Sequence, residues 1–311
     1  MPDVEFALVA EAGPLEAQAR LLVDSLRRFG GRHANAAVTV VSPRRSRRPS
    51  QATLRALRRA GARYVALDLA SACPDYPTSW RVHALAHVER QPGPDVLVQL
   101  DSDALFLGDV GELCADARAA GRPIDVKGMA TTGPGDGYEP YWAALCGLAS
   151  VDLEALPFVR TTVDDIRVRA VYNGGFVAAP RDAGLFTRAD ELLRRTAAAG
   201  LRPHAGRGLD IVAGTGAVGH AGSEWWGLSQ AATSVAAASL NLEIAPLPEA
   251  VNVPMHLWDD LARPPARVVH AHYHWLLAAP LASNNPLLDG RAGMMDDQLA
   301  WLADRVPLAV R

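Results

Sequence analysis

Lysine is nearly missing from this sequence of 311 residues, because Lys127 is the only one and every other basic residue is an arginine. We attribute this bias mainly to genomic base composition, and a selected role for Lys127 is the alternative. An excess of either charge is missing too, since 31 lysines and arginines stand against 34 aspartates and glutamates, a formal net charge of −3. Such a surface does not gather nucleic acid or an anionic membrane as a whole, and we expect neither as a partner.

Cysteines and long apolar runs are also scarce. The three cysteines (Cys73, Cys114 and Cys146) are widely spaced and form no CxxC pair, which argues against a disulfide framework and a zinc knuckle. The N-terminus lacks the features of a signal peptide, and no apolar run is long enough to span a bilayer. We therefore expect a cytoplasmic protein without integral membrane contact. Hydrophobic residues are abundant (49%), as in a folded enzyme.

Strand and helix signals alternate through the first third of the sequence. Short apolar runs are separated by segments whose apolar residues recur at helical spacing, and Ser50 and Gly61 have the residue types that begin and end a helix. This alternation indicates βαβ units and a mostly parallel sheet, so the fold class is α/β. The expected strands cover 4–10, 36–42 and 62–69, and the expected helices begin at Pro14, Ser50 and Ser79. Later helices are expected at 182–199 and 229–240, and a closing helix near the C-terminus.

Two aspartates follow the apolar strand in "DVLVQLDSDALFL". In an open parallel sheet, ligands bind at the carboxyl ends of the strands, where Asp101 and Asp103 lie. Residues at positions i and i+2 of an extended chain point to the same side, so the two carboxylates lie close together and repel. A hard divalent cation that also binds diphosphate oxygens would neutralise them, as Mg²⁺ or Mn²⁺ does in nucleotide sites.

Three histidines alternate with other residues in "RVVHAHYHWLL". In a strand, His270, His272 and His274 face the same way, and imidazole nitrogen is a good ligand for borderline metals. If this strand lies beside Asp101 and Asp103, a metal site of aspartates and histidine results, in which Mn²⁺ is favoured over Mg²⁺. We expect His270 and His272 as ligands, although the sequence does not decide among the three histidines.

The order and spacing of four motifs resemble the metal-dependent GT-A glycosyltransferases, and most closely the set called family 8. The motifs are "VLVQLDSDALF", "VYNGGFVAAP", "LSQAATSVAA" and "VVHAH", and the resemblance covers roughly Val4 to Trp275. It implies a Rossmann-like GT-A fold with a mixed, mostly parallel central sheet. It also implies a nucleotide-sugar donor, with a UDP-sugar favoured, and a small-molecule or saccharide acceptor. The implied organisation is one domain, with a nucleotide-sugar-binding half (1–110), an acceptor-binding half (111–280) and a C-terminal closing segment (281–311).

The resemblance also implies roles for residues near the donor nucleotide. Asp101 and Asp103 would bridge the cation to the diphosphate, and Ser102 would lie near the ribose. The residues at the end of the first strand and in the helix before the aspartates would contact the rest of the donor. These are Ala10 and Glu11, near the base, and Arg81, which would reach the phosphate or sugar.

Residues of the second half would surround the donor sugar. Asn173, Gly174 and Gly175 match the Asn-x-Gly turn of the family, and Gln230 matches the glutamine of its Asp-Gln pair. Side-chain oxygens of Asn173 and Gln230 would stabilise the oxocarbenium-like sugar, so both are catalytic candidates. The sequence departs from the family at Ser229, which replaces the aspartate of that pair. It also lacks the motif near the C-terminus of the family, whose lysine would contact the diphosphate.

Retention or inversion of the anomeric configuration is left open by the sequence. An inverting enzyme needs a carboxylate base opposite the leaving group, and Glu224 is the first candidate and Asp210 the second. Four aromatic residues of the second half could stack on an acceptor sugar or pack in the core. They are Trp142, Tyr172, Trp225 and Trp226.

Two other functions remain as alternatives at this point. A metal-dependent phosphohydrolase or nucleotidyltransferase also uses paired aspartates at a strand end, and it would act without a sugar acceptor. A non-catalytic protein that binds a sugar or nucleotide would tolerate loss of the metal.

Overall fold

Seven strands form one central sheet in the computed structural model, which describes residues 3–114, 116, 118–207, 209–213, 215–274, 276–277 and 285–306. Neighbouring strands run parallel except at β9, which is antiparallel to both β4 and β6. In spatial order the strands are β12 (Ile244–Pro246), β6 (Ala119–Pro123), β9 (Tyr172–Pro180), β4 (Val96–Leu100), β1 (Val4–Val9), β2 (Ala37–Ser42) and β3 (Arg63–Ala66).

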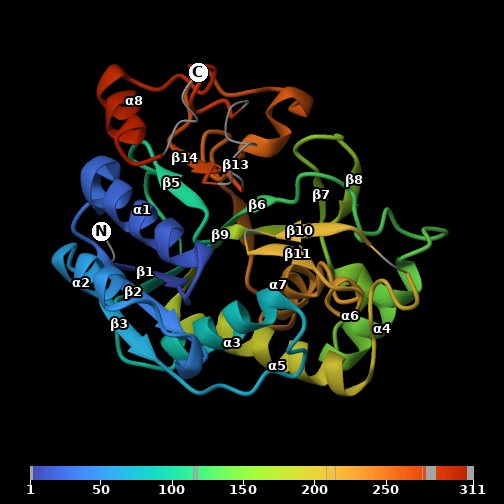
Figure 1. Cartoon of the computed structure of the whole chain (residues 1–311). Helices are drawn as coiled ribbons and strands as arrows, with labels where there is room; N and C mark the ends of the chain where they lie inside the picture. Colours follow the sequence, from blue (N-terminus) through green and yellow to red (C-terminus); the bar gives the residue numbers. More distant parts are fainter. Residues whose placement is uncertain are drawn as a thin grey trace.

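Helices cover both faces of this sheet (Figure 1). One face packs on α1 (Pro14–Phe29) and α2 (Gln51–Arg59), whose leucines join the side chains of β1, β2 and β4 in one hydrophobic cluster. A second cluster on the opposite face is covered mainly by α3, α5 and α7, and α4 packs against the last two. These helices are α3 (Pro77–Glu89), α4 (Glu139–Ala149), α5 (Leu185–Ala198) and α7 (Leu228–Ser239).

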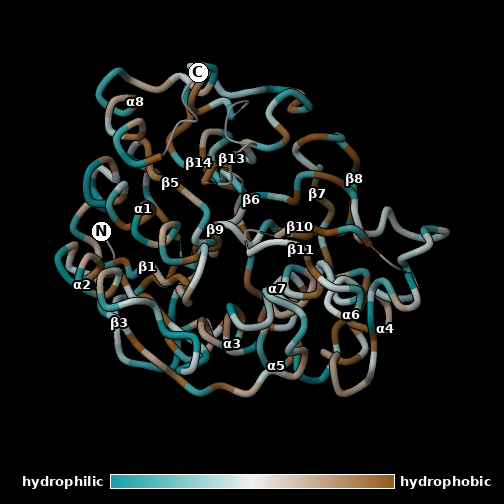
Figure 2. Tube along the Cα trace, in the orientation of Figure 1, coloured by the Kyte–Doolittle hydropathy of each residue, from teal (hydrophilic) through white to brown (hydrophobic). Residues whose placement is uncertain are grey.

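Local sequence explains where several of these helices begin and which face they bury. Proline is the second helical residue or the first in α1, α3 and α4, where its missing N–H costs nothing. Ser50 caps α2 by accepting a hydrogen bond from the backbone N–H of Thr53, as its sequence position predicts. The outer helices α1 and α2 carry both hydrophilic and hydrophobic residues along their length (Figure 2), because only one face of each touches the sheet.

A small second sheet lies above the central one and carries the histidine segment. Its strand order is β13-β14-β5, and β14 pairs antiparallel with β5, the strand that directly follows Asp103. On its side away from the central sheet, a third hydrophobic cluster includes Trp258, Tyr273 and Trp301. The strands are β5 (Ala104–Phe106), β13 (Val253–Pro254) and β14 (His270–His272), and the closing helix is α8 (Asp296–Ala303).

Two short hairpins and several single turns complete the described structure. The hairpins are β7 (Phe158–Arg160) with β8 (Arg167–Arg169), and β10 (Ile211–Ala213) with β11 (Gly216–Val218). The helix α6 (His220–Ser223) is a single turn, and 3₁₀ turns occur at Gly31–His33, Arg45–Arg47, Leu153–Ala155, Arg181–Ala183 and Met255–Asp260.

The expected α/β class and the mixed, mostly parallel sheet are confirmed. The expected strands and helices of the first third each appear within a few residues of their predicted bounds, and so do the helices expected at 182–199 and 229–240. The expected halves 1–110 and 111–280 both contribute strands to the central sheet. Among the described residues, no helix combines the length and apolar character needed to cross a membrane.

Candidate active site

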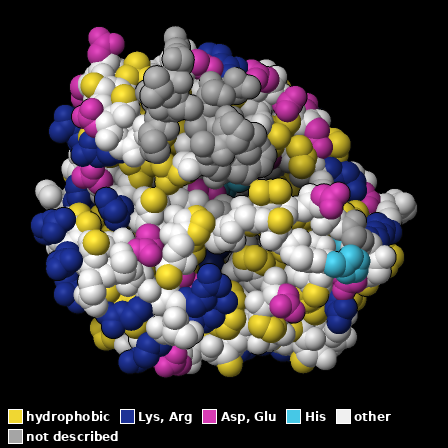
Figure 3. All heavy atoms as spheres, in the orientation of Figure 1, with side chains coloured by type: hydrophobic (Ala, Val, Ile, Leu, Met, Phe, Trp, Pro, Cys, Tyr) yellow, Lys and Arg dark blue, Asp and Glu magenta, His cyan; other side chains and the backbone are white. Residues whose placement is uncertain are grey.

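A cavity of about 650 Å³ opens at the carboxyl ends of β1, β4 and β6 (Figure 3). Because β9 is antiparallel, its first residues lie at this same edge of the sheet. The cavity is lined by Asp101, Ser102 and Asp103 after β4, by the beginnings of α3 and α7, and by the segment around β10. The strand ends where the sequence predicts a ligand site therefore surround a cavity of suitable size for a drug-sized ligand.

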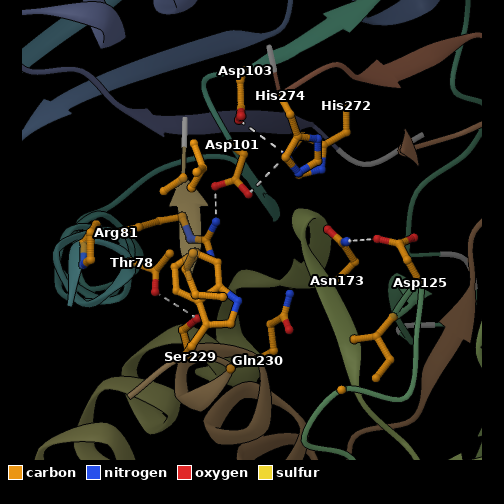
Figure 4. Close-up of a pocket in the computed structure, with 18 of the residues that line it drawn as sticks. Thr78, Arg81, Asp101, Asp103, Asp125, Asn173, Ser229, Gln230, His272 and His274 are labelled. Carbon is orange, nitrogen blue, oxygen red and sulfur yellow. Dashed lines mark hydrogen bonds and ion pairs between the residues drawn. The ribbon is translucent and has the colours of Figure 1, made fainter. Parts of the chain in front are cut away.

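Two carboxylates and two imidazoles converge at one end of this cavity (Figure 4). Nε2 of His272 lies 3.3 Å from Oδ1 of Asp103 and 3.7 Å from Oδ2 of Asp101. The rings of His272 and His274 stack with their centroids 4.0 Å apart. Asp103, His272 and His274 each offer one ligand atom, and these atoms lie within 4.8 Å of one another.

Burial and charge act against each other within this cluster. Burial would raise the pKa of Asp103, but attraction to His272 outweighs it and holds the pKa of this carboxyl well below its usual range. Burial would lower the pKa of His272, yet Asp103 and Asp101 raise it. Burial lowers the pKa of His274 well below that of a free imidazole. The carboxylate of Asp103 is therefore held in the charged form that a cation needs.

The donor set of this cluster fits a borderline divalent cation. Carboxylate oxygens suit Mg²⁺ and Mn²⁺, and imidazole nitrogens shift the preference toward Mn²⁺. Nδ1 of His272 is buried and has no hydrogen-bond partner among the residues that the structure describes, so none of them fixes the ring through that nitrogen. A cation between the aspartates and the histidines would give the converging ligand atoms a common partner.

His270 does not reach the cluster, contrary to the expectation that it is a ligand. Its ring is fully buried between Phe106 and Phe176, with ring centroids 4.8 and 5.1 Å away. The reason is its distance along the strand, since two residues of β-strand cover about 6.6 Å and carry His270 back from the strand end into the core. The histidines that meet the aspartates are thus His272 and His274, and not His270 and His272.

A backbone turn brings His274 beside His272. β14 ends at His272, and His274 has a φ of 53°, in the left-handed region that few residues other than glycine adopt. The chain leaves the strand direction there, so the two rings stack instead of lying one strand repeat apart. Strain of this kind is often found at functional sites.

Arg81 connects α3 to the aspartates. One guanidinium N–H donates to Oδ1 of Asp101, and the buried Nε has no hydrogen-bond partner in the described part of the chain. A Cβ atom on Gly174 would come within 3.0 Å of the Cζ of Arg81, so a side chain at this position would displace the guanidinium. Arg81 thus lies between Asp101 and Gly174 and lines the cavity.

Asn173 is held in one orientation by three partners. Its Nδ2 donates to Oδ2 of Asp125 at 2.8 Å, and its Oδ1 accepts from the backbone N–H of Gly175 at 2.8 Å and from Nδ2 of Asn252 at 3.3 Å. Because the amide oxygen already accepts two hydrogen bonds, the second N–H of Nδ2 is the better group for contact with a ligand. Asn173 lines the cavity, as expected.

The first turn of α7 forms the floor of the cavity. Gln230 lines it, and the neighbouring Ser229 shares hydrogen bonds with the hydroxyls of Tyr76 at 3.0 Å and Thr78 at 3.4 Å. Thr78 and Tyr76 also line the cavity from the beginning of α3. The residue that replaces the family's aspartate is thus bound to α3 through hydroxyl groups.

The residues expected near the base and ribose have different surroundings. Ser102 lines the cavity and donates a hydrogen bond of 3.0 Å to Gln18. Ala10 is fully buried, and Glu11 is buried against Arg44 in a salt bridge, so neither side chain is part of the cavity lining. Val9 and Leu15 line the cavity close to these positions instead.

Glu224 does not point into the cavity, although the sequence makes it the first candidate base. Its carboxylate binds Nη1 of Arg202 at 2.5 Å and accepts a hydrogen bond of 3.0 Å from the backbone N–H of Gly206. The second candidate, Asp210, lines the cavity. Closeness to the "WWGLSQ" segment in sequence is misleading here, because Arg202 and Gly206 bind the carboxylate and it is not part of the cavity lining.

Three of the four aromatic candidates belong to the core. Trp142 is fully buried, and its Nε1 donates to the backbone oxygen of Met129 at 2.9 Å. Tyr172 and Trp225 are also buried and do not line the cavity. Trp226 does line it, and its ring meets that of Tyr76 edge to face.

Sequence reasoning missed Asp125 and His256, and it left the role of Lys127 open. Asp125 lies just beyond β6, at the same edge as Asp101, and burial raises the pKa of its carboxyl despite Arg122. The ring of His256 lies 3.7 Å from that of His274, and the cavity also includes His256 in its lining. Lys127 lines the cavity with its Nζ 3.0 Å from Oδ2 of Asp136. The signal available for Asp125 was an acid shortly after a strand, but "AAGRP" hardly reads as a strand.

The chain is similar to known glycosyltransferases in sequence and in fold. A family model described as a Rhodobacterales glycosyltransferase domain matches residues 6–200, more than half of the chain. The curated proteins include no match.

The solved structure of the bifunctional glycosyltransferase WbbM matches with a TM-score of 0.53 and 12% identity over 98% of this chain and 50% of that one. This chain therefore spans about half the length of that protein. The galactosyltransferase LgtC, solved with donor and acceptor sugar analogues, matches with a TM-score of 0.50 and 12% identity over 99% and 98% of the two chains. These structural likenesses give the fold, which is GT-A.

Proposed function

The chain belongs to the Rhodobacterales glycosyltransferase domain family, and from this membership we propose that it moves a sugar from a nucleoside diphosphate sugar, with a UDP-sugar favoured, to a small-molecule or saccharide acceptor. The observation that carries the donor assignment is the convergence of Asp101, Asp103, His272 and His274 in the main cavity. A phosphohydrolase or a non-catalytic binding protein is less well supported, because the family match is to a transferase.

We propose that the aspartates and these two histidines hold a divalent cation, with Mn²⁺ favoured over Mg²⁺. When bound, the cation would supply Lewis-acid stabilisation of the charge that develops on the departing diphosphate. Asp101 is oriented for this task by Arg81, whose buried Nε has no hydrogen-bond partner among the described residues. In the presence of a donor, the guanidinium would bind a phosphate or sugar oxygen through charge-assisted hydrogen bonds.

The two helices that begin at the cavity support an anionic ligand. Thr78 and Arg81 lie in the first turns of α3, and Ser229 and Gln230 lie in the first turn of α7. The N-terminal ends of helices carry partial positive charge, which favours phosphate oxygens nearby. Hydroxyl, amide and guanidinium donors thus surround the place proposed for the diphosphate sugar.

Asn173 and Gln230 are proposed to contact the donor sugar as it becomes oxocarbenium-like. The second N–H of Asn173 is suited to a sugar hydroxyl, while Asp125 positions the amide through its other N–H. The acceptor hydroxyl must lose a proton as it bonds to the anomeric carbon. Asp210 and Asp125 are cavity carboxylates outside the metal cluster, which makes them better candidates for this role than Glu224.

Thermal unfolding with added Mn²⁺ and nucleotides tests the proposal. A ligand that binds only the folded protein raises its stability by RT ln(1 + [L]/Kd), about 2.7 kcal/mol at 100 times Kd. Mn²⁺ together with UDP or a UDP-sugar should therefore raise the melting temperature of the wild type, and Asp103→Asn should lose this response. The matched control is Asp182→Asn, since Asp182 is an exposed acid beyond the opposite end of β9. A wild-type protein that responds to no nucleoside diphosphate or its sugar, with Mn²⁺ or Mg²⁺, would contradict the proposal.

A further inference from the structure

Exposed large hydrophobic side chains are concentrated at the mouth of the cavity. Among the described residues only four are exposed, and two of these, Val126 (43% exposed) and Val212 (54%), line the cavity. Leu209, Ile211 and Met129 line it beside them. Exposed apolar patches on soluble proteins usually mark a binding surface. Figure 3 shows hydrophobic side chains beside the hollow in this face, over the β10–β11 hairpin.

The cavity changes in chemical character from its inner end to its mouth. At the inner end lie the carboxylates, imidazoles and amides described above, and Tyr138 and Trp226 add aromatic faces elsewhere in the lining. At the mouth Val126, Ile211 and Val212 form an aliphatic part of the wall beside Lys127 and Asp210, and β10 is hydrophobic in sequence (Figure 2). Sugars bind through hydrogen bonds and aromatic faces, whereas valine and isoleucine side chains provide neither. A bare saccharide would therefore leave this part of the wall without a complementary group.

We infer that the acceptor is amphipathic, with a hydroxyl group that reaches the donor sugar and an aliphatic group that lies against Val126, Val212 and Ile211. This inference rests on the proposed function, because the inner end must hold the donor for the mouth to hold the acceptor. The occupant is the acceptor itself, since the apolar wall is continuous with the lining of the same cavity that holds Asn173 and Gln230.

The β10–β11 hairpin is suited to bind such a group. In the part of the chain that the structure describes, its strands pair only with each other and form no ladder with the central sheet. A two-stranded hairpin is marginally stable by itself, so packing against an aliphatic ligand would stabilise it. Removal of Val212 and Ile211 from water by the ligand would supply the driving force.

Calorimetric binding of octyl and methyl β-D-glucosides, below the micellar concentration of the former, tests the inference without needing the natural acceptor. The wild type should bind the octyl glucoside at least roughly tenfold more tightly, the effect of burying about two methylene groups. Its binding should also show the more negative heat-capacity change. Val212→Ser and Val126→Ser should each reduce this preference severalfold. Leu240→Ser is the matched control, because Leu240 is an exposed hydrophobic residue at the far end of α7, and the preference should persist there.

Each outcome of this experiment has a defined meaning. Equal affinity of the wild type for the two glucosides would overturn the inference, and so would a preference that survives the Val126→Ser/Val212→Ser double variant. The nucleotide experiment above tests the proposed function separately. If Mn²⁺ and nucleotides bind but the octyl preference is missing, only the acceptor inference fails. If the octyl preference is present but no nucleotide binds, the donor assignment fails and the apolar mouth remains a ligand site.

Discussion

Replacing Gly175 by alanine should damage the cation site with a single methyl group. A Cβ atom there would lie 2.6 Å from Oδ1 of Asn252 and 2.7 Å from Nδ1 of His272, whereas ordinary contacts begin at 3.4 Å. The ring of His272 would therefore have to move back by about 0.7 Å, the difference between 3.4 and 2.7 Å. His272 is buried, so this movement disturbs its neighbours as well.

The expected size of the effect follows from packing and metal geometry. Inserting a methyl group into a packed interior costs about 1–3 kcal/mol of unfolding free energy. With an unfolding entropy of about 2.1 cal/mol/K per residue over 311 residues, this cost lowers the melting temperature by about 2–5 °C. Ligand distances in metal sites tolerate only about 0.2 Å, so Mn²⁺ binding should weaken roughly tenfold or more.

Calorimetric unfolding and a Mn²⁺ titration followed by electron paramagnetic resonance would measure both effects. Gly147→Ala is the matched control, because Gly147 lies inside α4 with open space around its Cβ position. Alanine is the better helix former, so this variant should gain about 0.5–1 kcal/mol and bind Mn²⁺ as the wild type does. The reasoning is refuted if Gly175→Ala keeps the wild-type melting temperature and manganese affinity.

Two further predictions concern the core and the loop beside the cavity. Trp142→Ala should lower the unfolding free energy by roughly 3–5 kcal/mol in guanidinium titrations, because Trp142 is fully buried. Trp226→Ala should lower the unfolding free energy by less. Equal losses in the two variants would show that Trp142 is not a core residue. Burial acts to raise the pKa of Asp136, but hydrogen bonds from Tyr138 and Lys127 outweigh it and lower this pKa from 3.8 to about 2. The pKa of Asp136 is thus lower in the folded state than in the unfolded chain. Its charged form therefore contributes to the free energy of unfolding fully above pH 4, and this contribution is lost as the pH falls toward 2. The difference in melting temperature between wild type and Asp136→Asn should shrink across that range, and a constant difference would contradict the assignment.

The parts of the site that were predictable depend on local rules. Asp101 and Asp103 follow a strand whose apolar residues identify it, and a parallel sheet places its strand ends at one edge. Arg81 and Gln230 were implied by the family resemblance, and both lie in the first turns of helices that the sequence indicates. For the aspartates the chain's own pattern was enough to place them beside a cavity.

The parts that were missed depend on tertiary structure. The choice between His270 and His274 rests on where β14 ends against β5 and on one residue with positive φ, and neither is visible in an alternating pattern. Asp125 follows β6, whose small and charged residues have low strand propensity. This segment forms a strand because it pairs with β9 and β12. Glu224 was misassigned because Arg202, 22 residues earlier in the chain, binds its carboxylate.

Lys127 is the single lysine of the sequence and lies on the cavity wall, so it can be labelled selectively. An amine-selective acylating reagent has a single side-chain target here, and that target is partly exposed on the wall of the cavity beside Tyr138. A fluorophore or crosslinker coupled at this position would report directly on occupancy of the cavity, without any engineered cysteine. Acylation would also remove the positive charge that faces Asp136, so the labelled protein needs its own stability measurement.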